Sequence, residues 1–167
     1  MERKKYSAPS GLGNGGNPVP VVKTTGYTTF PFQGKEETQK PKVLIFEDEM
    51  QIRFYLQTLV KSIGFEPIMA KDGVQGLELL KDIKPSVIIL DIMMPNMGGG
   101  LVYKELITRP ELKDIPVIFF SGVDRAAFFH YIRMLNATLP YPVPEPSNYV
   151  AKDADPDYLK SVIKKCV

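Results

Sequence analysis

Several stretches of this chain are apolar at nearly every position, a pattern typical of strands that are buried on both faces of a parallel sheet. The clearest is Val87–Leu90, which runs directly into Asp91, with Pro95 shortly after it. In open α/β sheets, ligands bind at the carboxyl ends of the strands. We therefore expect Asp91 to lie at the edge of the sheet where chemistry takes place. Strands are predicted at residues 43–46, 66–70, 87–90, 115–120 and 149–151.

Between these stretches, apolar residues recur at helical spacing, and residues that start or stop helices bound them. Gly64 follows the first helical pattern as a stop, and Asp72 and Asp155 precede the second and the last as N-caps. Gly98–Gly100 is interpreted as a flexible turn into the third helix, because no P-loop lysine or GxGxxG context surrounds it. The helices carry their apolar residues within 52–63, 74–80, 101–107, 125–136 and 159–163. This alternation predicts an α/β fold with a doubly wound parallel sheet, right-handed crossovers and helices on both faces.

Composition and charge indicate a globular protein without a domain for binding nucleic acid. The apolar fraction of 44% and the charged fraction of 24% are those of an ordinary globular protein. Residues 1–40 carry six Lys or Arg against three Glu, whereas residues 41–167 carry fifteen against sixteen acidic residues, so no basic domain suggests a nucleic-acid partner. The lone Cys166 excludes an internal disulfide and is interpreted as a small apolar residue. No apolar run is long enough for a membrane span or a signal peptide, so we expect a cytoplasmic protein.

The first part of the chain differs in character from the rest. Residues 1–41 are predicted to be a flexible Gly/Pro-rich N-terminal extension, because no apolar periodicity persists there. Tyr27, Phe30 and Phe32 leave open the alternative of an arm that docks on the domain or on a neighbouring subunit. Residues 42–167 form the predicted domain, and we expect no second domain that would bind DNA or catalyse a reaction.

Polar side chains follow four of the predicted strands: Glu47 and Asp48, Asp91, Ser121, and Lys152. Because parallel strands end at one edge of the sheet, these groups are expected to meet. Three neighbouring carboxylates repel one another unless a cation lies among them, and oxygen ligands without histidine or thiol suit Mg²⁺. A lysine and a hydroxyl facing such a site would stabilise a transferring phosphoryl group. A carboxylate can itself be the nucleophile and form an acyl phosphate.

Four motifs, in this order and on the predicted strands, give the chain a family resemblance. They are Val43–Glu49, Leu90–Pro95, Val117–Gly122 and Tyr149–Lys152. From about Pro41 to Val167, the chain resembles the receiver domain of two-component response regulators. The resemblance implies a flavodoxin-like fold with five parallel strands in the order 2-1-3-4-5, in agreement with the pattern of strands and helices.

The resemblance also implies roles for individual residues. Asp91 would be the phosphoacceptor, and Lys152 would pair with the phosphate. Asp48 would be the principal Mg²⁺ ligand, with Glu47 acting mostly through water and the backbone carbonyl of Met93 completing the set.

Further residues would report the phosphoryl group or depart from the family pattern. Ser121 would bond the phosphoryl group, and Tyr149 matches the aromatic switch residue that turns inward when the hydroxyl moves. Asp153 stands where family members usually have proline. The proline-rich stretch Pro140–Pro146 lies between Ser121 and Tyr149, in a connection that is longer than is usual in the family. This suggests a binding partner specific to this protein or an altered dimer.

The predicted function is that of a single-domain response regulator rather than an enzyme with its own catalytic domain. It would receive its phosphoryl group from a histidine kinase or a phosphotransfer protein. It would signal through the face built from the fourth helix, fifth strand and fifth helix, to a downstream protein that the sequence does not name or in a homodimer. The alternatives are a pseudo-receiver that acts as a scaffold without phosphorylation, and a metal-dependent phosphatase. Taken singly, Asp48 and Asp91 could also be mere helix N-caps.

Overall fold

The computed structural model describes residues 40–137, 144, 146 and 148–167. All the described residues belong to the unit Thr38–Val167, the second of two into which the chain divides. The predicted N-terminal extension lies outside the described residues except for its last two, and only Pro144 and Pro146 of the proline-rich stretch are described.

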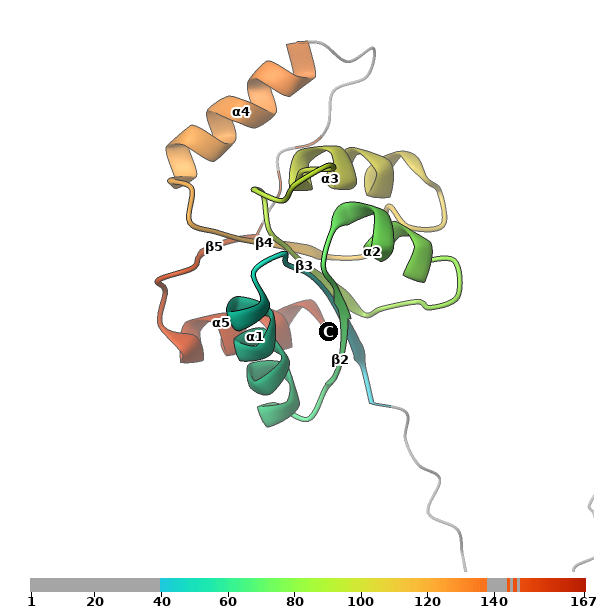
Figure 1. The fold of residues 1–167 in the computed structure, drawn as a ribbon, viewed down its shortest axis with the longest axis vertical. Coiled ribbons are helices and arrows are strands. Elements are labelled where there is room, and N and C mark those ends of the chain that lie inside the picture. Colours follow the sequence, from blue (N-terminus) through green and yellow to red (C-terminus); the bar gives the residue numbers. More distant parts are fainter. Residues whose placement is uncertain (1–39, 138–143, 145, 147) are drawn as a thin grey trace, which may run out of the picture. The chain divides into compact units, whose positions relative to one another are not determined.

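Five parallel strands alternate with five helices in the second unit, as predicted (Figure 1). The strands are β1 (Lys42–Phe46), β2 (Glu66–Ala70), β3 (Val87–Leu90), β4 (Val117–Ser121) and β5 (Asn148–Ala151). The helices are α1 (Met50–Ser62), α2 (Gly73–Leu79), α3 (Gly99–Thr108), α4 (Arg125–Ala137) and α5 (Pro156–Cys166). The strand order is β2-β1-β3-β4-β5, which confirms the predicted flavodoxin-like topology. Among the described residues, no helix has the length and apolarity that crossing a bilayer requires.

The sheet is covered on both faces, by α1 and α5 on one side and by α2, α3 and α4 on the other (Figure 1). Alternate residues of a strand point to opposite faces. In β1, Val43 and Ile45 therefore enter the core under α1 and α5, whereas Leu44 and Phe46 enter the core under the other three helices. This double burial is why the strands are apolar at every position, and it holds the strand ends at one well-defined edge.

Most helix boundaries follow the signals read from the sequence. Gly64 has a φ of 87° directly after the end of α1, a conformation that glycine adopts without steric cost. The side chains of Asp72 and Asp155 accept backbone N–H groups in the first turns of α2 and α5. Strand β4 begins at Val117, two residues later than predicted. Pro116 has no N–H to give to a ladder, which accounts for the later start.

The prediction of a flexible turn at Gly98–Gly100 is wrong for its last two residues. Gly98 is the N-cap of α3, and Gly99 and Gly100 are buried residues of its first turn. A Cβ on Gly99 would lie 2.1 Å from the carbonyl oxygen of Asp91, and one on Gly100 would lie 2.6 Å from the ring of Tyr131. The glycines are thus explained by close packing of α3 against the end of β3 and against α4.

The aromatic residues of α4 serve mainly in packing. Phe128 is fully buried, with its ring centroid 4.7 Å from that of Phe119 and 5.6 Å from that of Tyr149. Phe129 packs partly against the same core, whereas Tyr131 is 41% exposed. The aromatic content of α4 is therefore largely the inner surface of the helix that lies over β4.

Candidate functional site

The carboxyl ends of β1, β3 and β5 converge on one cluster of charged side chains. Strands β1 and β3 are neighbours in register, with Phe46 opposite Leu90, so the residues that follow them are also neighbours. The N–H of Asp91 donates to the carbonyl of Phe46 at 3.0 Å. On the far side of β4, the N–H of Lys152 donates to the carbonyl of Ser121 at 3.0 Å. Main-chain hydrogen bonds thus set the places from which the charged side chains extend.

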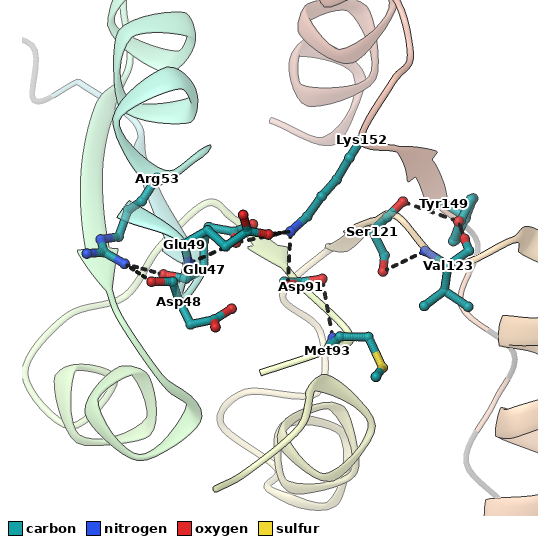
Figure 2. A network of polar contacts seen from close by, with 10 residues as sticks. All are labelled: Glu47, Asp48, Glu49, Arg53, Asp91, Met93, Ser121, Val123, Tyr149 and Lys152. Carbon is teal, nitrogen blue, oxygen red and sulfur yellow. Dashed lines mark hydrogen bonds and ion pairs between the residues drawn. The ribbon is translucent and has the colours of Figure 1, made fainter. Parts of the chain in front are cut away.

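Three carboxylates and one ammonium form the cluster (Figure 2). Glu47, Asp48 and Asp91 each offer an oxygen, and these oxygens all lie within 4.8 Å of one another. The Nζ of Lys152 lies 3.1 Å from Oδ2 of Asp91 and 3.0 Å from Oε1 of Glu47. It also lies 3.5 Å from Oε1 of the exposed Glu49. The sequence-predicted acidic residues and lysine are therefore brought together.

Burial makes the electrostatics of this cluster unusual. Glu47 is fully buried and Asp91 is 2% exposed. Burial, and then the nearby charge of Asp91, raise the pKa of Glu47 from its ordinary value of 4.5 to about 7, despite the opposing effect of Lys152. Burial acts against the charged form of Lys152, but its hydrogen bond with Glu47 and the charges of Asp91 and Glu47 outweigh this and raise the pKa of Lys152. The cluster holds more negative charge than its single ammonium can offset.

These residues fit a hard divalent cation. The donor set consists of carboxylate oxygens alone, which Mg²⁺ prefers over nitrogen or sulfur. Oε2 of Glu47 is buried and has no hydrogen-bond partner, which is costly unless a ligand or water satisfies it. Among the described residues, no side chain or N–H bonds the carboxylate of Asp48, which leaves it free to coordinate. Glu47, Asp48 and Asp91 are therefore the residues that could hold Mg²⁺.

The backbone that follows Asp91 forms a hydrogen bond with the Asp91 side chain. The N–H of Met93 donates to Oδ1 of Asp91 at 3.3 Å, so both oxygens of this carboxylate have a protein donor, the other being Lys152. The side chain of Met93 is 68% exposed. The predicted use of the Met93 carbonyl as a metal ligand stays a prediction.

Ser121 and Tyr149 form a second group beside the acidic cluster (Figure 2). The buried Oγ of Ser121 accepts the N–H of Val123 at 3.3 Å, and within the described part of the chain it makes no bond to the carboxylates. The hydroxyl of Tyr149 donates to the carbonyl of Ser121 at 3.4 Å and to that of Val123. Tyr149 also stacks on the buried Phe128, so this group connects the end of β4 with α4.

Asp153 leaves the placement of Lys152 intact. The peptide bonds of the described residues are all trans, and the exposed Asp153 sits in a turn closed by the N–H of Ala154 and the carbonyl of Ala151 at 3.0 Å. This turn leads directly to the N-cap Asp155. The lysine reaches the carboxylates although the residue after it is not proline.

Sequence reasoning missed Arg53 and the contact of Glu49 with Lys152. Nη1 of Arg53 donates to the carbonyl of Glu47 at 2.6 Å and to that of Asp48 at 3.0 Å (Figure 2). The sequence contained a signal for a special role of Arg53. The helix dipole disfavours a cation near the start of a helix, so a cation there indicates a stabilising partner outside the helix. Arg53 is the fourth residue of α1, and the acidic residues Glu47–Glu49 directly precede this helix.

The family model described as the response regulator receiver domain matches residues 43–164. Protein PilG of Pseudomonas aeruginosa is 32% identical over 90 residues, which are 54% of this chain and 67% of PilG. The probable transcriptional regulator ycf27 of Porphyridium aerugineum is 39% identical over 85 residues, which are 51% of this chain and 34% of that protein. The match thus spans about a third of the length of this regulator.

Two solved structures of response regulators are similar to this chain. The response regulator TrrA of Thermotoga maritima, in complex with Mg²⁺-BeF, is 27% identical with a TM-score of 0.61 and covers 76% of this chain and 99% of TrrA. The chemotaxis response regulator CheY4 of Vibrio cholerae is 20% identical with a TM-score of 0.65, covers 77% of this chain and 99% of CheY4, and supports the fold alone. With the family match over most of its length, the chain belongs to the response regulator receiver domain family.

Proposed function

We propose that Asp91 accepts a phosphoryl group from a histidine kinase or a phosphotransfer protein, in a reaction that depends on Mg²⁺. The observation that carries this proposal is the position of the Asp91 carboxylate between two partners. Lys152 lies 3.1 Å from one of its oxygens, and an oxygen of Asp91 lies within 4.8 Å of those of Glu47 and Asp48. The Mg²⁺-BeF complex of TrrA further supports Mg²⁺ as the cation.

The chemistry is an in-line displacement at phosphorus. An oxygen of Asp91 forms the new P–O bond while the P–N bond of a phosphohistidine donor breaks, and the electron pair of that bond leaves with the imidazole nitrogen. The product is an acyl phosphate on Asp91. Mg²⁺, held by the carboxylates of Glu47, Asp48 and Asp91, would offset charge on the phosphoryl oxygens. The Lys152 ammonium adds a fixed positive charge and hydrogen-bond donors in a site largely shielded from water.

The output is proposed to pass from Ser121 to α4. A phosphoryl group on Asp91 gives the Ser121 hydroxyl a stronger acceptor than any it has among the described contacts. Movement of this hydroxyl would alter the loop of Ser121 and Val123, whose carbonyls accept the Tyr149 hydroxyl. It would thereby alter the stacking of the Tyr149 ring on Phe128. A downstream protein or a second copy of the chain would then bind the α4–β5–α5 face.

The test is phosphorylation by a small donor. The protein is incubated with Mg²⁺ and acetyl phosphate, and its intact mass is measured. We expect a gain of one phosphoryl group in the wild type and in the control D82N, whose aspartate is exposed and lies outside the cluster. D91N should abolish the gain, and chelation of Mg²⁺ should do the same.

Other outcomes would point to the alternatives. A wild type that binds Mg²⁺ but gains no mass would refute the proposal in favour of a scaffold. Continuous release of phosphate from acetyl phosphate over many turnovers, without an accumulated phosphoprotein, would indicate a phosphatase. A gain of mass that persists in D91N would place the acceptor elsewhere.

A further inference from the structure

The main chain of the β1–α1 loop is held by a side chain from α1. Nη1 of Arg53 donates to the carbonyls of Glu47 and Asp48, at 2.6 Å and 3.0 Å. Both carbonyls belong to residues whose side chains enter the acidic cluster. One nitrogen therefore fixes the two consecutive peptide units from which two of the three candidate metal-ligating carboxylates extend (Figure 2).

The other bonds to this loop hold Glu47 and Glu49 rather than Asp48. The N–H of Glu47 donates to the carbonyl of Ala70, the N–H of Glu49 donates to Oε1 of Glu47, and Lys152 contacts both glutamates. The N-cap Glu49 makes no side-chain cap hydrogen bond. The carboxylate of Asp48 has no donor among the described residues, and Oε2 of Glu47 has none either. The direction in which the Asp48 carboxylate points therefore depends on its backbone, and among the described residues Arg53 is the side chain that bonds this backbone.

Two physical effects of Arg53 on a bound cation have opposite signs. The guanidinium is positively charged and bonds the main chain of two residues whose carboxylates enter the cluster, so its charge repels Mg²⁺ and its removal would tighten binding. Its hydrogen bonds hold the ligands in place, so its removal would weaken binding. Groups that orient metal ligands from outside the coordination sphere commonly contribute about 10-fold to 100-fold in metal affinity. Arg53 is partly buried and bonds carbonyls rather than carboxylates, which leaves the carboxylate charge available to the metal.

We infer that Arg53 is a positioning residue for the Mg²⁺ site, and that its hydrogen bonds to the loop outweigh the repulsion of its charge. This inference rests on the Mg²⁺ site proposed above. It assigns to Arg53 no contact with the metal or with the phosphoryl group. It predicts that loss of Arg53 weakens Mg²⁺ binding although it removes a positive charge from the vicinity of the cation.

The experiment is a calorimetric titration of Mg²⁺ into the metal-free protein. R53M should raise the dissociation constant for Mg²⁺ about 10-fold or more. R53K keeps the charge but not the guanidinium, and should bind with intermediate affinity. The matched control is K71M, which removes a positive charge from the exposed Lys71 at the same edge of the sheet, where its ammonium bonds none of the described acidic residues. K71M should bind Mg²⁺ as the wild type does or slightly more tightly.

A second measurement separates positioning from a general loss of structure. The rate of phosphorylation by acetyl phosphate is recorded against Mg²⁺ concentration. In R53M the half-saturating concentration should rise about 10-fold, while the rate at saturating Mg²⁺ stays within about twofold of the wild type. If R53M fails to fold by circular dichroism, R53K carries both measurements, and its affinity must fall below that of the wild type.

The outcomes distinguish this inference from the proposed function. R53M or R53K that binds Mg²⁺ as tightly as the wild type, or more tightly, overturns the role of Arg53 and leaves the Mg²⁺ site standing. A lower rate at saturating Mg²⁺ with an unchanged dissociation constant overturns it as well. A wild type that binds no Mg²⁺ overturns the metal site and this inference together.

Discussion

Replacing Glu47 by glutamine should stabilise the metal-free protein at neutral and alkaline pH. Glu47 is fully buried, and burial together with Asp91 raises the pKa of Glu47 from 4.5 to about 7, although Lys152 lies 3.0 Å away. Its ionised form is therefore disfavoured in the folded state relative to the unfolded chain. Glutamine has nearly the same shape and carries no charge, so E47Q removes this cost and keeps the packing.

The magnitude follows from the two pKa values. A pKa of 4.5 unfolded and about 7 folded means that the folded state binds more protons between these pH values, so stability falls as the pH rises through this window. At about 1.36 kcal/mol per pH unit, the complete effect is roughly 3 kcal/mol. The free energy of unfolding of E47Q should thus exceed that of the wild type by about 3 kcal/mol at pH 8, and by less than about 1 kcal/mol at pH 5.

The assay is urea unfolding in the presence of a chelator at several pH values from 5 to 8, followed by circular dichroism. E49Q is the control, because Glu49 also contacts Lys152 but its side chain is 63% exposed. This variant should stay within about 1 kcal/mol of the wild type at every pH. If E47Q is less stable than the wild type at pH 8, the attraction between Glu47 and Lys152 outweighs burial and the reasoning fails. A difference that does not change with pH would refute it equally.

Two further predictions concern packing around the site. G99A should destabilise the fold by about 3 kcal/mol or more, because its Cβ would meet the main chain of Asp91. G100A should cost less than about 1 kcal/mol, because its Cβ meets the half-exposed ring of Tyr131 and alanine favours a helix. Thermal unfolding measures both variants, and equal losses of stability would contradict this packing. Y149F should lower the unfolding free energy by about 1 kcal/mol, because the hydroxyl of Tyr149 bonds two carbonyls, and urea unfolding without any loss would show that water replaces it.

Much of the fold was predictable from the sequence for a physical reason. Residues such as Val87–Leu90 are buried on both faces of the sheet, and their continuous apolar pattern distinguishes them from the half-buried helices. Once the strands are parallel, Asp48, Asp91 and Lys152 must emerge at one edge, so their convergence follows from the order of elements.

What the sequence left hidden depends on contacts between distant residues. Local composition predicts a turn at Gly99 and Gly100, and only the approach of Asp91 and Tyr131 shows why helical residues there lack a Cβ. At Arg53 the position of a cation near the start of a helix was a signal, but its two carbonyl partners were hidden, because they depend on the path of the loop rather than on its composition.

The balance of charge in the cluster links its two proposed ligands. When ionised, Glu47, Asp48 and Asp91 carry three negative charges against the one positive charge of Lys152, and one divalent cation would offset the remainder. A phosphoryl group on Asp91 replaces one carboxylate charge by about two phosphate charges, so it increases the demand for positive charge. Mg²⁺ should therefore bind more tightly to the phosphorylated protein than to the free one, and by linkage it should favour phosphorylation by the same factor. On this reasoning, the buried Glu47 carboxylate, whose ionised form is disfavoured in the metal-free fold, is also one of the groups that would hold the cation on which phosphorylation of Asp91 is proposed to depend.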